Sequence, residues 1–244
     1  MGLAPCAGDP RMTIAHLDHA ERIAAGIGFE WDRLPHKVAS VADVGADDIE
    51  VSFHRERDSH RGLHRHGAIR RLWADGIDAA FLDEIARMPA LETLYLQRVT
   101  ATDLRPLAAL PRLRRLIVKD ATRIDDLTWV AGLAAIETLG LENLKRVASL
   151  EPLSGLTGLR ALGVEGSMWT PMRVATLQPL AALTGLEYLF LTNLRVADRS
   201  LRPLHGLSGL RSLQCARWYE DGEFAALAAA LPGVRCGWLA ASRR

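Results

Sequence analysis

The sequence predicts an α/β solenoid of about eight stacked repeats, and two repeated patterns carry this prediction. The first is a nine-residue segment with apolar residues at its first, fourth and sixth places, as in LETLYLQRV from Leu91. Its copies begin at residues 69, 91, 113, 136, 159, 186, 210 and 234, a spacing of 22 to 27 residues. Because one unit cannot bury its own leucines, stacked neighbours must supply the core.

The second pattern places leucine at every third residue after several of these segments. In SLEPLSGLTGL, the leucines are Leu150, Leu153, Leu156 and Leu159. A period of three favours a 3₁₀ turn over an α-helix, whose period is about 3.6 residues. Two outer segments fit the α-helical period better, namely residues 81–88 and 224–231.

Together these patterns resemble the leucine-rich-repeat family, in the short-repeat, internalin-like class of bacterial proteins. The resemblance covers roughly residues 69–240, with the pattern L-x-P-L-x-x-L-x-x-L-x-x-L-x-L. It implies a curved, right-handed solenoid with a parallel sheet on its concave face and 3₁₀ or short helices on its convex face. The asparagine common after each strand is kept only at Asn143 and Asn193, so we do not expect a continuous asparagine ladder.

Residues 1–68 precede the repeats, and we interpret them as an N-terminal cap that shields the first open edge of the sheet. Within this cap we expect a disordered start, a helix over residues 13–25, a strand over 49–53 and a loop rich in His and Arg. Residues 69–244 then form the solenoid, and the degenerate last unit serves as its closing cap.

The residues between the inward leucines point out from the concave face, because side chains alternate along a strand. The fifth places of successive units predict a shallow trough with aromatic walls and a floor almost free of side chains. Large apolar groups on an open sheet face are costly unless something covers them, so they indicate a contact site. In chain order these fifth places are Trp73, Tyr95, Ile117, Gly140, Gly163, Phe190 and Gln214.

Charged residues border the trough, with Glu142 and Glu165 beside the floor and Arg115 and Lys119 to one side. A partner segment with an apolar knob and a nearby basic residue would suit this surface. The alternative is that repeat proteins tolerate such residues without purpose, but their clustering favours contact. The predicted partner-binding residues are Trp73, Tyr95, Arg115, Ile117, Lys119, Glu142, Glu165, Trp169, Tyr188 and Phe190.

The unit that starts at residue 159 is longer than the others and carries the insertion SMWTPMRV at residues 167–174. Met168, Trp169 and Met172 are large apolar residues in a loop, where polar residues are usual. Insertions in repeats map to loops on one face and often bind. Trp169 could equally fold back as a lid over its own repeat, and both readings stay open.

A run from His54 to His66 alternates histidine with arginine. Its members His60, His64 and His66 are weak candidates for zinc ligands, and the run could also contact phosphate or an acidic surface. However, H-x₃-H-x-H is not a specific spacing and no cysteine lies nearby. A solvated loop between cap and repeats is the favoured interpretation, so we predict no metal site and no cofactor.

The composition excludes several classes of function. With 30 basic and 29 acidic residues, no global field favours nucleic acid or an anionic membrane. There is no apolar run of eighteen residues and no secretory signal, and the three cysteines are too sparse for a disulfide framework, so we expect a cytoplasmic protein. No G-x-S-x-G, P-loop, H-E-x-x-H or dinucleotide motif is present, so we do not expect an enzyme.

The hypothesis that follows is a protein-binding module whose concave face captures a partner protein, with an inhibitor or immunity-type factor as a sub-case. One alternative is a metal- or anion-responsive protein that uses the run from His54 to His66. Another is a structural scaffold that pairs copies of the same chain, although nothing in the sequence indicates a homo-oligomer.

Overall fold

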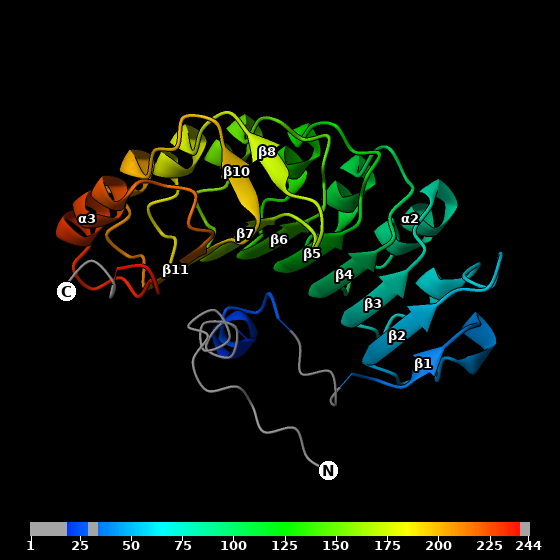
Figure 1. Ribbon diagram of the computed structural model, residues 1–244. Coiled ribbons are helices and arrows are strands. Elements are labelled where there is room, and N and C mark those ends of the chain that lie inside the picture. The colour runs from blue at the N-terminus through cyan, green and yellow to red at the C-terminus, as the bar shows by residue number, and fades with distance from the viewer. Residues whose placement is uncertain (1–18, 29–33, 240–244) are drawn as a thin grey trace, which may run out of the picture.

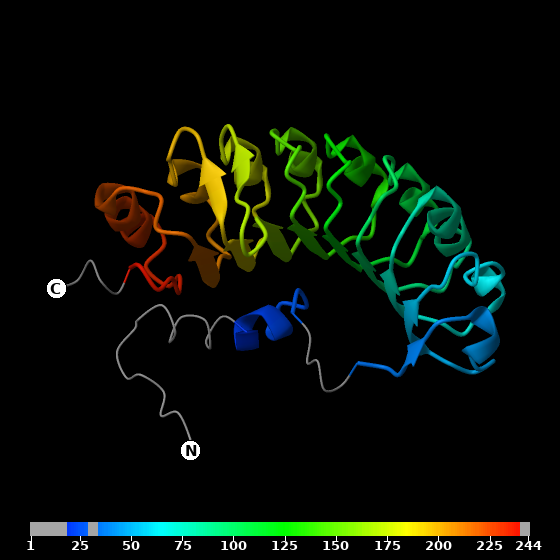
Figure 2. The same ribbon diagram turned by 45° about the vertical axis from the view of Figure 1, so that its right-hand side comes forward.

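The structure, a computed structural model, describes residues 19–28 and 34–239. Its main feature is an arc-shaped sheet of nine strands in the order β1-β2-β3-β4-β5-β6-β7-β9-β11 (Figure 1). Every neighbouring pair in this sheet is parallel. Short helices line the outer side of the arc (Figure 2), so the predicted α/β solenoid with a concave parallel sheet is confirmed.

The elements follow the repeat along the chain. The strands of the large sheet are β1 (Lys37–Val38), β2 (Glu50–His54), β3 (Arg71–Asp75), β4 (Thr93–Gln97), β5 (Arg115–Lys119), β6 (Thr138–Glu142), β7 (Ala161–Glu165), β9 (Tyr188–Leu191) and β11 (Ser212–Cys215). A separate two-stranded sheet pairs β8 (Met172–Val174) with β10 (Leu194–Val196). The two long helices are α2 (Ala79–Ala86) and α3 (Asp221–Ala230). The 3₁₀ turns are η2 (Val41–Asp43), η3 (Leu63–Arg65), η4 (Arg105–Ala109), η5 (Thr128–Gly132), η6 (Glu151–Gly155), η7 (Gln178–Ala182) and η8 (Arg202–Leu204).

Equivalent positions of successive repeats pair directly across the sheet. Tyr95 pairs with Trp73 on one side and with Ile117 on the other. Gly163 in turn lies between Gly140 and Phe190. The predicted columns of side chains are therefore confirmed. Strand β2 extends them, because its residues pair with β3 in the same register, so the sheet continues across the boundary predicted at residue 68.

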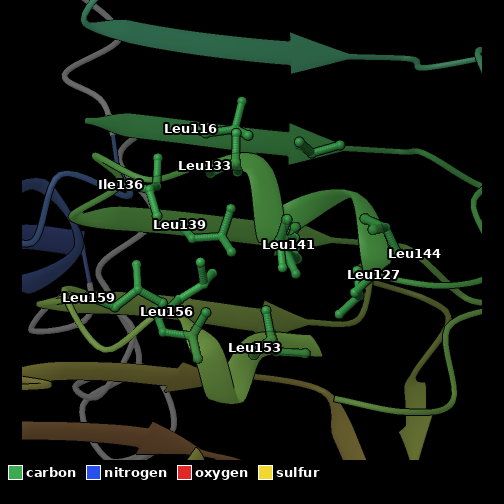
Figure 3. Close-up of a cluster of buried hydrophobic side chains, with 14 of the residues drawn as sticks. Leu116, Leu127, Leu133, Ile136, Leu139, Leu141, Leu144, Leu153, Leu156 and Leu159 are labelled. Atoms are coloured by element: carbon green, nitrogen blue, oxygen red, sulfur yellow. The ribbon is translucent and has the colours of Figure 1, made fainter. Parts of the chain in front are cut away.

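The core lies between the sheet and the convex turns. Leucines of one strand, such as Leu139 and Leu141 of β6, point toward leucines of the turns, such as Leu127 and Leu153 (Figure 3). All four are at most 1% exposed. The period-three leucines are confirmed as 3₁₀ turns, and η4, η6, η7 and η8 each carry a proline as their second residue, within the first turn, where its missing N–H costs no hydrogen bond.

Within two residues of the end of several strands, one residue turns the chain in the left-handed conformation. Arg98, Asp120, Asn143 and Asn193 occupy this place with φ between 51° and 62°. Asparagine tolerates that conformation better than most residues. The Asn143 amide donates a hydrogen bond to Asp120 Oδ1 at 2.6 Å, the Asn193 amide donates to the backbone oxygen of the preceding unit's turn, and Arg98 pairs with Asp75. A ladder of mixed residues thus replaces the asparagine ladder.

The two ends of the sheet are closed differently. At one end, β1 and β2 continue the parallel pairing. At the other end, the last unit keeps only a single bridge between Ser212 and Arg235, and α3 packs beside η8. The degenerate final repeat therefore no longer presents a full strand for further pairing.

We expect two substitutions of Asn143 to separate its hydrogen bond from its backbone conformation. Asn143→Gly removes the hydrogen bond to Asp120 and should cost about 1 kcal/mol of unfolding free energy. Asn143→Ala also places an ordinary side chain at positive φ and should cost about 1 kcal/mol more. Urea unfolding of both variants beside the wild type measures this difference. Equal unfolding free energies of the two variants would show that the left-handed conformation at position 143 does not contribute to stability.

Candidate functional site

The concave face is occupied by a segment of the same chain. Residues 19–24 are helical and residues 25–28 form a turn, and this segment lies against the inner side of the sheet (Figures 1 and 2). Its contacts run from Tyr95 on β4 to Ser212 and Gln214 on β11 and to Arg235 beyond that strand. The sequence places these residues in a cap at the sheet edge. The structure places them on the sheet face instead, because that is where their apolar side chains become buried.

Ile27 fills the floor of the trough. A Cβ atom on Gly163 would lie 3.4 Å from Cδ1 of Ile27, and one on Gly140 would lie 3.7 Å from its Cγ2. Ile27 therefore lies directly over the two glycines, and Ile117 also leans over Gly140, where a Cβ atom would lie 2.8 Å from its Cδ1. The result is a second apolar cluster, bordered by Trp73 and Tyr188, whose buried members are Ala25, Ile27, Tyr95, Ile117, Ala161 and Phe190.

An ion pair fixes the helical part of the segment. Both terminal nitrogens of the Arg22 guanidinium donate hydrogen bonds to the two carboxylate oxygens of Glu165 at 2.7 Å. Arg22 also lies over the ring of Phe190, 5.1 Å from its centroid. Because Glu165 is only 5% exposed, losing Arg22 would leave a buried carboxylate without this partner.

Glu21 joins the segment to the last repeats. Its carboxylate accepts hydrogen bonds from the Ser212 hydroxyl and from the Gln214 amide, the latter at 2.8 Å, and pairs with Arg235 at 3.0 Å. Farther along the segment, the Thr138 hydroxyl donates to the backbone oxygen of Ala25 at 3.4 Å. Both polar and apolar contacts therefore hold residues 19–28 against the sheet.

The Arg235 contact completes a charge ladder along one border of the concave face. The second place of successive repeats alternates in sign, and neighbours pair as Arg70–Glu92, Arg114–Glu137, Arg160–Glu187 and Arg211–Glu187. Arg235 ends the column next to Arg211, and Glu21 of the docked segment supplies its acidic partner. The sequence analysis missed this alternation, although the repeat spacing contains it. The second-place residues are Arg70, Glu92, Arg114, Glu137, Arg160, Glu187, Arg211 and Arg235.

Gly26 is needed at the tightest point of the docked segment. Its φ of +75° disfavours other residues, and a Cβ atom there would lie 2.6 Å from Nε of Arg115. Burial lowers the pKa of Arg115, and repulsion from Arg71 lowers it further. Any larger residue at position 26 would thus meet both backbone strain and the Arg115 side chain.

The segment leaves part of the trough unfilled. A cavity of about 210 Å³ remains between Arg22 and Ile27 on one side and Tyr95, Lys119 and Glu142 on the other. Lys119 and Glu142, which are paired neighbours on β5 and β6, form an ion pair at 2.9 Å in its wall. Burial raises the pKa of Tyr95, and the nearby carboxylate of Glu142 raises it further.

Nine of the ten predicted partner-binding residues lie on the concave strands, and Trp169 does not. The sequence suggests that the apolar members are open to solvent. In the structure Tyr95, Ile117 and Phe190 are buried, since residues 19–28 pack against them. The exposed positions are elsewhere. Trp169 is 87% exposed and Met168 is 83% exposed, so Trp169 is not the lid that was one interpretation of the insertion.

The predicted histidine candidates are not brought together. His60 is 1% exposed and packs on Phe81, with ring centroids 4.9 Å apart. His64 Nδ1 lies 2.5 Å from Glu84 of α2. Burial raises the pKa of Glu84, but the hydrogen bonds from His64 and from the backbone N–H groups of Gly62 and His64, together with the charge of Arg87, lower it by more in total. Within residues 19–28 and 34–239, no group of three or more His, Cys, Asp or Glu side chains is placed to hold a metal ion.

Cys215 and Cys236, which the sequence could not place relative to each other, are neighbours. Both are free thiols, and a hydrogen bond joins them. This bond and burial raise the pKa of Cys215, whereas the same bond lowers the pKa of Cys236. They connect the last full strand to the closing segment.

Comparison with known proteins shows the fold. No protein-family model matches the chain, and no curated protein matches it significantly. Among solved structures, an internalin C2 from Listeria monocytogenes is 28% identical with a TM-score of 0.51, covering 63% of this chain and 63% of that one. An internalin (inlF) from Listeria monocytogenes is 19% identical with a TM-score of 0.51, covering 77% of this chain and 60% of that one. A complex of TLR13 with ssRNA13 is 17% identical with a TM-score of 0.50, covering 77% and 28%.

These likenesses confirm a leucine-rich-repeat fold of the internalin-like kind. The chain spans less than two thirds of the length of each of these proteins. The described residues form one repeat structure and hold no separate catalytic domain. None of the helices in this part of the chain is long and apolar enough to cross a membrane.

We expect Gly163→Val to expel residues 19–28 from the concave face. The valine methyl groups would take the space of the Ile27 side chain, while valine suits a strand better than glycine. Amide hydrogen exchange of residues 22–28 should accelerate by about tenfold or more, equivalent to about 1.4 kcal/mol of lost docking free energy. Gly155→Val is the matched control, because a Cβ atom there meets nothing within 4 Å. Unchanged exchange in Gly163→Val would contradict this account of the floor.

Proposed function

We propose that this leucine-rich-repeat protein is a protein-binding module whose concave face captures a segment of a partner protein. The observation that carries the proposal is that this face already holds a protein segment. It buries Ile27 on a glycine floor and pairs the neighbouring Arg22 with Glu165. A surface with a fitted apolar pocket and a desolvated charge beside it has the features of a binding hot spot.

The charges of the trough favour a particular partner chemistry. Glu142 and Glu165 both border the floor, and Glu165 is almost completely buried. These carboxylates favour a basic side chain next to the apolar knob of the partner and disfavour a polyanion such as nucleic acid. A protein segment that resembles residues 19–28 meets both requirements.

In this proposal residues 19–28 compete with the partner. Capture requires the segment to leave the trough, so the apparent affinity falls in proportion to the fraction of molecules in which the trough is open. Binding then covers a surface of the partner, and that occlusion is the output of the module. An inhibitor or immunity-type factor would act in this way.

We expect two kinds of variant to change partner capture in opposite directions. Arg22→Ala with Ile27→Ala weakens the built-in segment and leaves the trough intact, so partner affinity should rise by about tenfold if the closed form exceeds about nine tenths of the molecules. Gly163→Val fills the trough and should abolish capture. Affinity capture from source-cell lysate with quantitative mass spectrometry identifies the partner, and titration of the purified partner gives the affinities.

Trp169→Ala is the control, because Trp169 is exposed and lies outside the concave face. A partner that binds the wild type, the Arg22/Ile27 variant and the Gly163 variant equally would place the binding surface elsewhere. Loss of the partner in Trp169→Ala alone would assign it to the inserted loop.

A further inference from the structure

A second hollow lies away from the concave face, beside the small sheet of β8 and β10. Its volume is about 340 Å³, which falls in the range of small-molecule sites. Figure 1 shows the small sheet standing apart from the nine-stranded sheet, and the hollow shares no lining residue with the trough. It is lined by Arg173, Val174, Arg195, Val196, Ala197, Arg199 and Trp218.

The hollow concentrates positive charge. Arg173 and Arg195 occupy directly paired positions of the two parallel strands, and Arg199 is the third arginine of the lining. Like charges in paired positions destabilise a sheet unless an opposite charge lies near them. No carboxylate lines the hollow, and none of the three arginines forms an ion pair with another described residue. Asp198, next in sequence to Arg199, is exposed and accepts a hydrogen bond from the Ser200 amide.

One of these arginines is held and partly desolvated. The Arg195 guanidinium lies over the Trp218 ring, 4.4 Å from its centroid. Its Nε atom is buried and has no hydrogen-bond partner among the described residues. Since no hydrogen bond holds this Nε atom, the contact with Trp218 is what fixes the guanidinium beside the hollow.

The remaining lining is apolar. Val174, Val196 and Ala197 form part of the wall, and Trp218 remains 40% exposed. Val174 and Val196 are already buried, but a bare inorganic ion would leave Trp218 and Ala197 in contact with water. A ligand that joins an anionic group to an apolar or aromatic group would cover them.

We propose that this hollow binds a phosphate monoester carried by an apolar or aromatic group. A single carboxylate carries one negative charge, whereas a phosphate monoester carries about −1.5 to −2 near pH 7 and offers three acceptor oxygens. Arginine is the residue best suited to such oxygens, because its planar fork donates two parallel hydrogen bonds. The phosphate faces Arg173, Arg195 and Arg199, and the organic group lies against Trp218 and Ala197. This inference does not depend on the proposed role of the concave face.

Phenyl phosphate is the test probe, titrated into the full chain by calorimetry and by tryptophan fluorescence. We expect saturable binding with one site, at least tenfold tighter than inorganic phosphate, and no binding of phenol. Trp218→Phe should remove the fluorescence change. Arg173→Gln and Arg199→Gln, both at exposed positions, should each weaken binding by about tenfold or more. Arg112→Gln, an exposed arginine of a convex turn, is the matched control and should bind like the wild type.

Binding that is unchanged in Arg173→Gln and Arg199→Gln, or equally weakened in Arg112→Gln, would overturn the site. Equal affinity for inorganic phosphate and phenyl phosphate would overturn the organic part of the ligand. A short phosphotyrosine peptide distinguishes two possible ligands, a phosphorylated protein and a free phosphate ester. Tighter binding than phenyl phosphate assigns the hollow to a phosphorylated protein, and weaker binding assigns it to a free ester. Thermal unfolding of each variant confirms that it is folded.

Discussion

Each repeat of this chain can bury its leucines only between two neighbouring repeats, and this requirement determines most of the structure. Leu139 of β6, for example, reaches complete burial together with leucines of adjacent strands and turns. The stacking forces equivalent residues of successive strands into register, so every place in the repeat becomes a column on the surface. The chemistry of the concave face is therefore set column by column, independently of the core beneath it.

Because the concave face is separate from the core, large apolar side chains at the fifth places of the repeats are left without cover from the repeats. Tyr95, Ile117 and Phe190 point away from the leucine core, and the repeats themselves offer nothing to cover them. Residues 19–28 provide the cover and gain their own burial in return. The docking is therefore a balance between two apolar surfaces that each need a partner. A competing segment with the same chemistry can shift this balance without disturbing the repeats.

The periodic features could be predicted from the sequence because each recurs many times. The strands, the 3₁₀ turns and the columns all follow from leucine spacing, and the trough at Gly140 and Gly163 follows from the columns. The sequence even predicts a ligand with an apolar knob and a nearby basic residue, which Ile27 and Arg22 provide. The sequence could not show that these two residues belong to the same chain as the trough. Arg22 and Glu165 are 143 positions apart, and residues 19–28 are not part of any repeat. The small residues around Gly26 are the one sequence feature that is compatible with close packing of this segment on another surface.

One geometric rule produces both the charge ladder and the arginine hollow. Parallel pairing places a residue of one unit directly beside a residue of the next, whatever residues stand there. In the second column the residues alternate, so Arg160 meets Glu187 and the charges cancel. Between β8 and β10 the residues do not alternate, so Arg173 meets Arg195 and the charges add. Exposed Arg–Glu pairs such as Arg160 and Glu187 contribute little to the free energy of unfolding and mainly favour the correct register. The like-charged pair Arg173 and Arg195 destabilises the sheet of β8 and β10 by repulsion. A bound anion would neutralise that repulsion and so stabilise the sheet.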